Sequence, residues 1–330
     1  MRRSLAFLFG ALLAGVLAAP AVAADADGSE GADGFTIKDP RITESSGLVA
    51  SRAHPGVYWT HNDSDDGAFL YAVDSRTGET VATVTMSGVG APRDVEAISI
   101  GPDGNLYVGD IGDNLGGTWD HVWIYELPEP KQLKDQTIRA TQYDVKYADG
   151  ARDAEALMVH PKTGRVYIAS KNEDGGGLYE GPAQLSTSGT NTFKRIDDID
   201  LWVTDGAFSP DGKQLAVRGY FGGIAYEWNG GKLKKQGRLS VPLQGQGESV
   251  TYTPDGSTLL YGSEGGESSV EAGNVPGGGG KSPSEGGGSA AGDDGGDGGD
   301  GPNADFKMGA IALAVALAVV FGLKRLLRRG

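Results

Sequence analysis

Short apolar segments alternate with polar turns through the middle of the chain, between residues 35 and 270. One turn phrase recurs there, as in "GPDGNLYVGD", and its copies carry Pro55, Pro102, Pro161, Pro210 and Pro254. Proline presets the turn, glycine accepts a positive φ, and an apolar or aromatic strand follows. No stretch of this region sustains the 3.6-residue period of a helix. The pattern predicts short β-strands joined by tight turns.

The five turn prolines are 44 to 59 residues apart, and one blade of a β-propeller needs about 40 to 50 residues. Four strands can be assigned around most copies. A β-sandwich is the alternative, but it does not produce turn phrases at this spacing. We therefore expect an all-β, five-bladed β-propeller over residues 35–270. The last copy lacks a fourth strand, so we expect the N-terminal segment "FTIK" (residues 35–38) to complete that blade and close the ring.

The first 24 residues have the layout of a secretory signal peptide. Arg2 and Arg3 precede an apolar run, and small residues at Ala21 and Ala23 mark a cleavage site. The paired arginines leave a twin-arginine export route open. In both cases the mature chain is expected to be exported.

The other end predicts a single membrane-spanning helix over residues 306–324 and a basic cytoplasmic tail over 325–330. Its apolar run would span roughly 24 Å as a helix, against a hydrocarbon core of roughly 30 Å, and flanking residues can make up the difference. A buried core helix is the alternative. No LPxTG-type motif precedes the run, so we expect a retained anchor. Residues 271–305, rich in glycine and acids, are expected to form a disordered tether. The positive-inside rule then places the propeller outside the cell.

Charge and composition narrow the possible partners. The formal net charge is −15, which disfavours nucleic acid as a partner. The chain has no cysteine, which excludes disulfides, thiol catalysis and thiolate metal sites. We expect the partners to be the membrane, through the C-terminal helix, and an extracellular protein or small ligand.

The phrases "ESSGLVASRAHPGVYWTHNDSDD" and "DVEAISIGPDGNLYVGDIGDN" resemble exported propeller proteins of actinobacteria, described as WD40-like or YVTN-like and poorly defined in function. More distantly, the chain is similar to the esterase-like phytase propellers. The resemblance covers roughly residues 36–270 and implies the fold and the exported location more than a chemistry. The chain departs from true WD40 repeats, because a Trp-Asp pair occurs once, at Trp119, outside the repeat context.

Aligning the predicted innermost strands places four acids and a serine in one column. Its members are Ser46, Glu96, Glu155, Asp205 and Glu248. In a propeller the start of the innermost strand lies at one mouth of the central channel, so these side chains would form a ring. Gathered carboxylates must be relieved by cations, by raised pKa values or by basic neighbours. The candidate neighbours are Arg93, Arg152, Lys171 and Arg218.

A second group of polar residues follows the predicted middle strands. Asp110 and Asp113 are the candidate metal ligands in it, because Ca²⁺ takes six to eight oxygen ligands. EF-hand spacing is absent, and Asp is also an ordinary turn residue. The chain has neither a G-x-S-x-G nor an HExxH motif, and His61 is the best candidate for a general base. The ligand-binding candidates are therefore Glu96, Glu155, Asp205, Glu248, His61 and Arg218.

These features favour a membrane-anchored extracellular module that binds a ligand or a protein. The alternative is a calcium-dependent phosphatase, esterase or lactonase-like hydrolase, in which Ca²⁺ polarises an ester or phosphoryl oxygen. A structural protein of the cell envelope is a third possibility. A hydrolase would require Glu96, Glu155, Asp110 and Asp113 to converge on one cation. Whether the chain is an enzyme stays open at the level of sequence.

Overall fold

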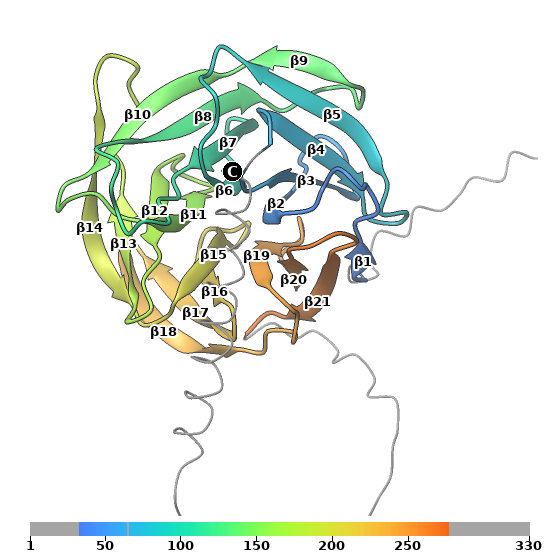
Figure 1. Cartoon of the computed structure of the whole chain (residues 1–330). Coiled ribbons are helices and arrows are strands. Elements are labelled where there is room, and N and C mark those ends of the chain that lie inside the picture. The colour runs from blue at the N-terminus through green and yellow to red at the C-terminus, as the bar shows by residue number, and fades with distance from the viewer. Residues whose placement is uncertain (1–32, 65, 277–330) are drawn as a thin grey trace, which may run out of the picture. The chain divides into compact units, whose positions relative to one another are not determined.

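The computed structural model describes residues 33–64 and 66–276, and in these ranges the chain is all-β, with strands β1 to β21 and no helix. The sheets are arranged around a central axis, with one strand of each nearest the axis and the others following outward (Figure 1), which is the arrangement of a β-propeller. The predicted signal peptide, membrane helix and basic tail lie outside the described residues, as does most of the predicted tether. No helix within the described ranges is long and apolar enough to cross a membrane.

Antiparallel four-stranded units succeed one another along the chain, each numbered here from its innermost strand outward. Unit 1 holds β2 (Ser45–Ala50), β3 (Val57–Asn62), β4 (Phe69–Asp74) and β5 (Thr80–Ser87). Unit 2 holds β6 (Val95–Ile100), β7 (Asn105–Asp110), β8 (Val122–Pro128) and β10 (Thr141–Tyr147). Unit 3 holds β11 (Ala154–Val159), β12 (Val166–Ser170), β13 (Gly176–Glu180) and β14 (Asn191–Ile199).

Unit 4 holds β15 (Val203–Phe208), β16 (Gln214–Gly219), β17 (Gly222–Asn229) and β18 (Lys232–Leu239). Unit 5 holds β19 (Gly247–Tyr252), β20 (Thr258–Ser263), β21 (Ser269–Asn274) and β1 (Phe35–Thr36). Strand β21 thus continues four residues into the segment that begins at residue 271. Strand β9 (Gln136–Arg139) adds to the outer edge of unit 1, parallel to β5, and a parallel β10–β14 pair joins units 2 and 3.

The two ends of the described chain meet in unit 5. Phe35 pairs with Val270 and Thr36 with Ser269, in antiparallel register. The Phe35 ring packs on Tyr58 with ring centroids 5.5 Å apart. The expected pairing of the N-terminal segment with the last unit is confirmed. The innermost strands β2, β6, β11, β15 and β19 each contact the next and the last contacts the first, so the sheet units form a closed ring.

The hydrophobic core lies between neighbouring units rather than within one. Trp59 of unit 1, which is fully buried, packs in one cluster with Ile98 and Val108 of unit 2. Its indole N–H donates to the Glu129 carboxylate at 2.9 Å. Equivalent clusters join units 2 and 3, units 3 and 4, units 4 and 5, and units 5 and 1. This packing fixes how the innermost strands are placed around the axis.

An irregularity recurs where the first and second strands of each unit pair. In unit 2, Val95 pairs with Asp110 and Ala97 with Gly109, which leaves Glu96 as an extra residue. The same interruption leaves Glu155 extra in β11 and Glu248 extra in β19. Such β-bulges turn a side chain out of the regular alternation. Three of the predicted ring acids are therefore bulge residues.

The bulge of unit 4 falls on Thr204, because Val203 pairs with Gly219 and Asp205 with Arg218. Asp205 therefore occupies a regular pairing position one residue after the bulge. In unit 1 the bulge contains Ser46 and Gly47, which lie opposite His61. The five structural equivalents of the bulge thus include Ser46 but not Asp205.

Candidate cation site

Three carboxylates from two neighbouring units come together at the inner end of the sheets. Asp63 follows β3, Asp94 precedes β6, and Glu96 is the bulge residue of β6. One oxygen of each lies within 4.8 Å of the others. Asp94 and Glu96 are only 6% and 3% exposed. Oxygen atoms at this spacing can share a single cation.

The backbone of both units holds these acids in place. The Val95 N–H donates to the Asp63 carbonyl at 3.0 Å, which ties unit 2 to unit 1 beside the site. The Ser46 hydroxyl donates to the Glu96 carbonyl at 3.0 Å and lies 3.2 Å from Glu96 Oε2. Asn114 donates to Asp94 Oδ2 at 3.0 Å. Each carboxylate is thus positioned by contacts that extend beyond its own strand.

The hydrogen bonds of the described residues leave one oxygen of this group without a partner. Asp63 Oδ1 is buried and has no hydrogen-bond partner there. Burial raises the pKa of Asp63 well above its usual range, and the neighbouring Asp94 raises it further. Burial also raises the pKa of Glu96, with Asp63 and Glu155 contributing. Either protons or a bound cation must therefore relieve the group at neutral pH.

Gly112, in the loop after β7, leaves room beside these oxygens. A Cβ at this position would lie 2.6 Å from Glu96 Oε1 and 2.8 Å from Asp94 Oδ2. Such distances are shorter than the contacts that Cβ atoms make in proteins. The backbone therefore approaches the carboxylates as closely as only glycine allows.

A buried ion pair lies next to the three acids. Lys171 Nζ is 2.5 Å from Glu155 Oε1, and the two side chains are 15% and 2% exposed. Burial alone would lower the pKa of Lys171, but the charge of Glu155 raises it well above its usual range. The Lys171 ammonium also lies 5.5 Å from the centre of the Tyr220 ring. Lys171, one of the four basic neighbours predicted for the ring of acids, is thus the partner of Glu155.

Glu248 belongs to the same electrostatic neighbourhood. Burial raises its pKa, while the charge of Lys171 opposes that shift. The bulge acids Glu96, Glu155 and Glu248 therefore act on one another around a single ammonium group. Arg93 and Arg152 bind elsewhere. The Arg93 guanidinium lies against Trp119 and Trp123, and Arg152 pairs with Asp149.

The two acids predicted as metal ligands lie outside the group of three. Asp110 accepts hydrogen bonds from the Asp94 N–H at 3.0 Å, the Arg93 N–H at 3.1 Å and the Tyr125 hydroxyl at 2.6 Å. These contacts position the backbone on which Asp94 stands.

Asp113 accepts hydrogen bonds from the backbone of Thr118 and Trp119, and its own N–H donates to Asp153. It therefore braces the loop after β7. Neither carboxylate is free of protein donors in the way Asp63 Oδ1 is.

Two further predicted residues link unit 4 to unit 5. Asp205 accepts hydrogen bonds from Gly206 N–H at 2.7 Å and Val250 N–H at 2.8 Å. The Arg218 guanidinium, fully buried, donates to the carbonyls of Ser249 and Gly262 at 2.7 and 2.6 Å. Burial lowers the pKa of Arg218 to about 10. This geometry favours a structural role for both.

His61 is 1% exposed and lies against the bulge of β2. Its Nδ1 is 3.1 Å from the Asn62 carbonyl, and Nε2 has no hydrogen-bond partner among the described residues. Burial lowers the pKa of His61 to about 4. The imidazole is therefore neutral at physiological pH, and its enclosure keeps it from acting on an external substrate.

Sequence reasoning counted Asp63 among the polar residues that follow the predicted middle strands but selected neither Asp63 nor Asp94 as a ligand. Asp94 had a signal, because the phrase Arg-Asp-x-Glu-Ala occurs at residues 93–97 and again at 152–156. Asp63 had none beyond its place after an apolar strand. The spacing to the turn proline also shows why Asp205 does not align with the bulge residues. Glu96, Glu155 and Glu248 each precede their turn proline by six residues, whereas Asp205 precedes Pro210 by five.

Comparisons with known proteins find similar solved structures but no matching protein family. No protein-family model matches the chain, and no curated protein matches its sequence. Among solved structures, it is similar to a chain of a mitotic checkpoint complex, with 15% identity, a TM-score of 0.39 and coverage of 69% of this chain and 60% of the other. It is also similar to a candidate 6-phosphogluconolactonase from Bacteroides uniformis, with 15% identity, a TM-score of 0.39 and coverage of 71% and 68%.

A third similar structure is that of the RRP9 WD40 repeats, with 9% identity, a TM-score of 0.40 and coverage of 74% of this chain and 98% of the other. The chain thus spans less than two thirds of the first of these proteins and most of the third. At these identities and TM-scores the likeness supports no conclusion about activity.

Proposed function

We propose that this protein is an exported, membrane-anchored, five-bladed β-propeller that acts as a binding module, and that a divalent cation held by Asp63, Asp94 and Glu96 forms its recognition site. The predicted signal peptide and C-terminal helix support the location. The predicted tether would hold the propeller at the extracellular face, away from the membrane. The closed ring of innermost strands supports the blade count.

The convergence of the three carboxylates carries the cation proposal. Their oxygens lie within 4.8 Å of one another, and one of them, Asp63 Oδ1, is buried without a partner among the described residues. A set of hard oxygen donors suits Ca²⁺ better than a softer metal. Binding would also remove the like-charge repulsion that raises the pKa values of these acids.

Three protein carboxylates leave coordination positions open, because Ca²⁺ takes six to eight oxygens. A ligand or partner that offers a carboxylate or phosphate oxygen would complete the sphere. The four acids that the sequence predicted for a hydrolase do not converge, but the open positions at Asp63, Asp94 and Glu96 favour hydrolysis as a second candidate function, with the cation polarising an ester or phosphoryl oxygen and activating water. Nitrophenyl acetate and nitrophenyl phosphate, each with and without Ca²⁺, separate hydrolysis from binding alone.

The test is thermal melting of the metal-free full-length chain with EDTA and then with excess Ca²⁺. A ligand that binds only the folded state adds about 2.7 kcal/mol at a hundredfold excess over its Kd. For a domain of this size, that corresponds to a rise of roughly 5–10 °C in Tm. Asp63→Asn and Glu96→Gln should abolish the rise.

The variants themselves should fold well. Removing one charge from the group relieves repulsion, so their melting temperatures in EDTA should equal or exceed that of the wild type. Asp120→Asn is the matched control, since the Asp120 side chain is 95% exposed. It should keep the whole Ca²⁺ response. An unchanged response in both site variants would reject the proposed site.

A further inference from the structure

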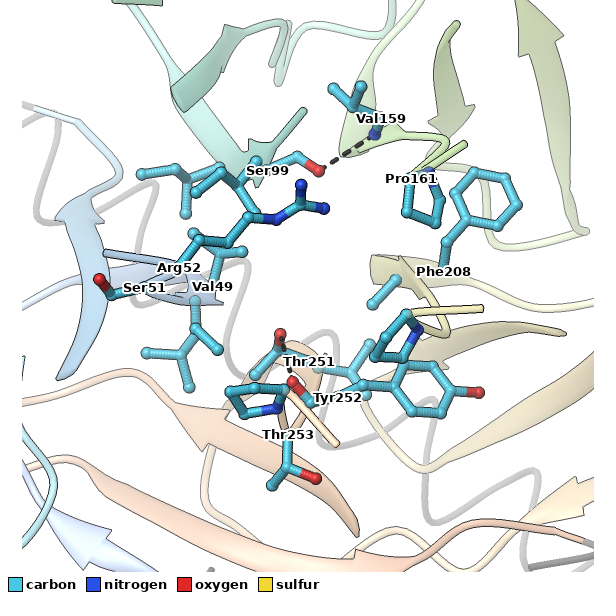
Figure 2. A pocket seen from close by; sticks show the side chains of 18 of the residues that line it. Val49, Ser51, Arg52, Ser99, Val159, Pro161, Phe208, Thr251, Tyr252 and Thr253 are labelled. Carbon is cyan, nitrogen blue, oxygen red and sulfur yellow. Dashed lines mark hydrogen bonds between the residues drawn. The ribbon is translucent and has the colours of Figure 1, made fainter. Parts of the chain in front are cut away.

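A second concave site lies at the opposite end of the innermost strands. The acids stand at the starts of these strands, and a cavity of about 440 Å³ lies toward their ends. All five innermost strands contribute to its wall, with Val49, Ser99, Val159, Phe208 and Thr251 among the lining residues (Figure 2). This volume falls within the range of about 300–1,000 Å³ typical of small-molecule sites.

The wall of this cavity is predominantly apolar. Segments that line it include 48–50, 98–100, 206–208 and 250–252, and turn prolines surround the opening. Val49 and Phe208 are partly exposed there. Figure 2 shows these side chains arranged around the hollow. An aliphatic or aromatic group of a ligand would bury apolar surface here at roughly 25 cal/mol per Å².

The charge at the opening has one sign. Arg52 and Lys162 line the cavity, and no Asp or Glu of the described residues lines it. Neither side chain forms an ion pair with an acid in residues 33–64 or 66–276. In Figure 2 the Arg52 side chain extends from the Ser51 side toward Ser99, at the edge of the hollow. In a chain with a net charge of −15, a described cavity wall whose charged residues are both cations favours an anionic ligand.

The segment that carries Arg52 contacts one acid, Glu129. The Glu129 carboxylate already accepts several hydrogen bonds. It accepts hydrogen bonds from Ser51 Oγ at 2.5 Å, Trp59 Nε1 at 2.9 Å and Ala53 N–H at 3.0 Å. The Arg52 backbone N–H donates to the Glu129 carboxylate at 3.3 Å, but within the described residues the Arg52 guanidinium forms no ion pair with Glu129. The guanidinium can therefore bind a ligand.

We propose that this apolar cavity binds a small amphipathic carboxylate, with the apolar chain among the innermost strands and the carboxylate at Arg52 and Lys162. The concave shape, the apolar wall and two cations without an ion pair in the described part of the chain support this chemical class together. The site is separate from the carboxylate group of Asp63, Asp94 and Glu96 and does not depend on a cation there.

Calorimetric titration of the full-length chain with octanoate, octanol and octylammonium tests the proposal, because the three share one apolar chain and differ in charge. Octanoate should bind about tenfold more tightly than octanol, and octylammonium should bind weakest. Butanoate should bind more weakly than octanoate, by roughly fourfold for each missing CH₂ group.

The double variant Arg52→Gln with Lys162→Gln should reduce octanoate binding to the level of octanol. Lys232→Gln, which removes a surface cation at the start of β18, should leave it unchanged. Equal affinity for octanoate and octanol would overturn the proposal, and so would equal affinity for butanoate and octanoate. Absence of octanoate binding, as expected if the chain or a second copy fills the cavity, would also overturn it. The Ca²⁺ response of Asp63, Asp94 and Glu96 is tested separately, so none of these outcomes bears on it.

Discussion

Replacing Lys171 with Met tests the electrostatic balance of the inner sheet ends. The substitution keeps much of the side-chain length but removes the ammonium that lies 2.5 Å from Glu155. Glu155 is 2% exposed, so its charge would remain buried without its partner. Breaking a buried pair from one side costs about 3–5 kcal/mol. At about 2–4 °C per kcal/mol, Tm should fall by roughly 6–20 °C.

The loss should depend on pH in a defined direction. Without Lys171, burial raises the pKa of Glu155 in the folded state further above its value in the unfolded chain. The folded state then binds more protons, so stability falls as pH rises from the unfolded pKa toward the folded one. The pKa of Glu155 in the wild type is already raised to about 8, so Lys171→Met should be least destabilised near pH 5 and most destabilised near pH 9, where only the wild type ionises Glu155 beside its partner. Urea denaturation followed by tryptophan fluorescence measures both values.

The double variant Lys171→Met with Glu155→Leu completes the cycle. Removing both charges should restore most of the stability, because an apolar pair can replace a buried ion pair at little cost. Lys234→Met is the matched surface control. Lys234 pairs with Glu227 at 3.0 Å, but the side chains are 77% and 46% exposed, so its loss should cost at most about 1 kcal/mol. A loss at pH 9 no larger for Lys171→Met than for Lys234→Met would refute the reasoning.

Three other predictions concern the cation site and ring closure. Gly112→Ala places a methyl group against Glu96, so it should remove most of the Ca²⁺-induced rise in Tm and lower the free energy of unfolding in EDTA by about 1–3 kcal/mol. The control Gly237→Ala, whose Cβ meets no described atom within 4 Å, should keep the rise. Because the carboxyl pKa values are raised, the stability against urea in EDTA should fall as pH increases above about 5. The Ca²⁺ affinity measured by calorimetry should increase over the same range as protons leave the ligands, and an affinity that does not change with pH would contradict this. Phe35→Ala should cost about 3 kcal/mol in urea denaturation, because the ring is buried where the two ends of the ring pair, and a cost near zero would show that closure adds little.

The repeated turn phrases predicted the β-strands because their physical cause is local. Proline and glycine determine the turn, and the apolar residues after them enter the sheet. The same repetition placed Glu96, Glu155 and Glu248 in one column, and each is a bulge residue. The fourth member was misaligned because Pro210 lies one residue closer to Asp205. A spacing of six residues before the proline selects Thr204, which is the bulge residue of unit 4.

The group of three acids could not be obtained from the repeat. Asp63 belongs to unit 1, and it meets Asp94 and Glu96 because the Val95 N–H bonds its carbonyl across the boundary between units. Contacts between units depend on core packing, such as that of Trp59, rather than on local sequence. Asp110 was predicted as a ligand because it ends an apolar strand, yet its carboxylate accepts a hydrogen bond from the Asp94 N–H. Residue type alone does not separate a ligand from a residue that positions one.

The most direct test of the cation site is calorimetric titration of the metal-free full-length chain with CaCl₂, compared with the Asp63→Asn and Glu96→Gln variants. The wild type should bind Ca²⁺ at a saturable site that both variants lack, while Asp120→Asn retains it. Any weak binding by acids outside the site is common to all four proteins and cancels in the comparison. If the site variants bind Ca²⁺ like the wild type, or if no protein binds it, Asp63, Asp94 and Glu96 do not form a cation site.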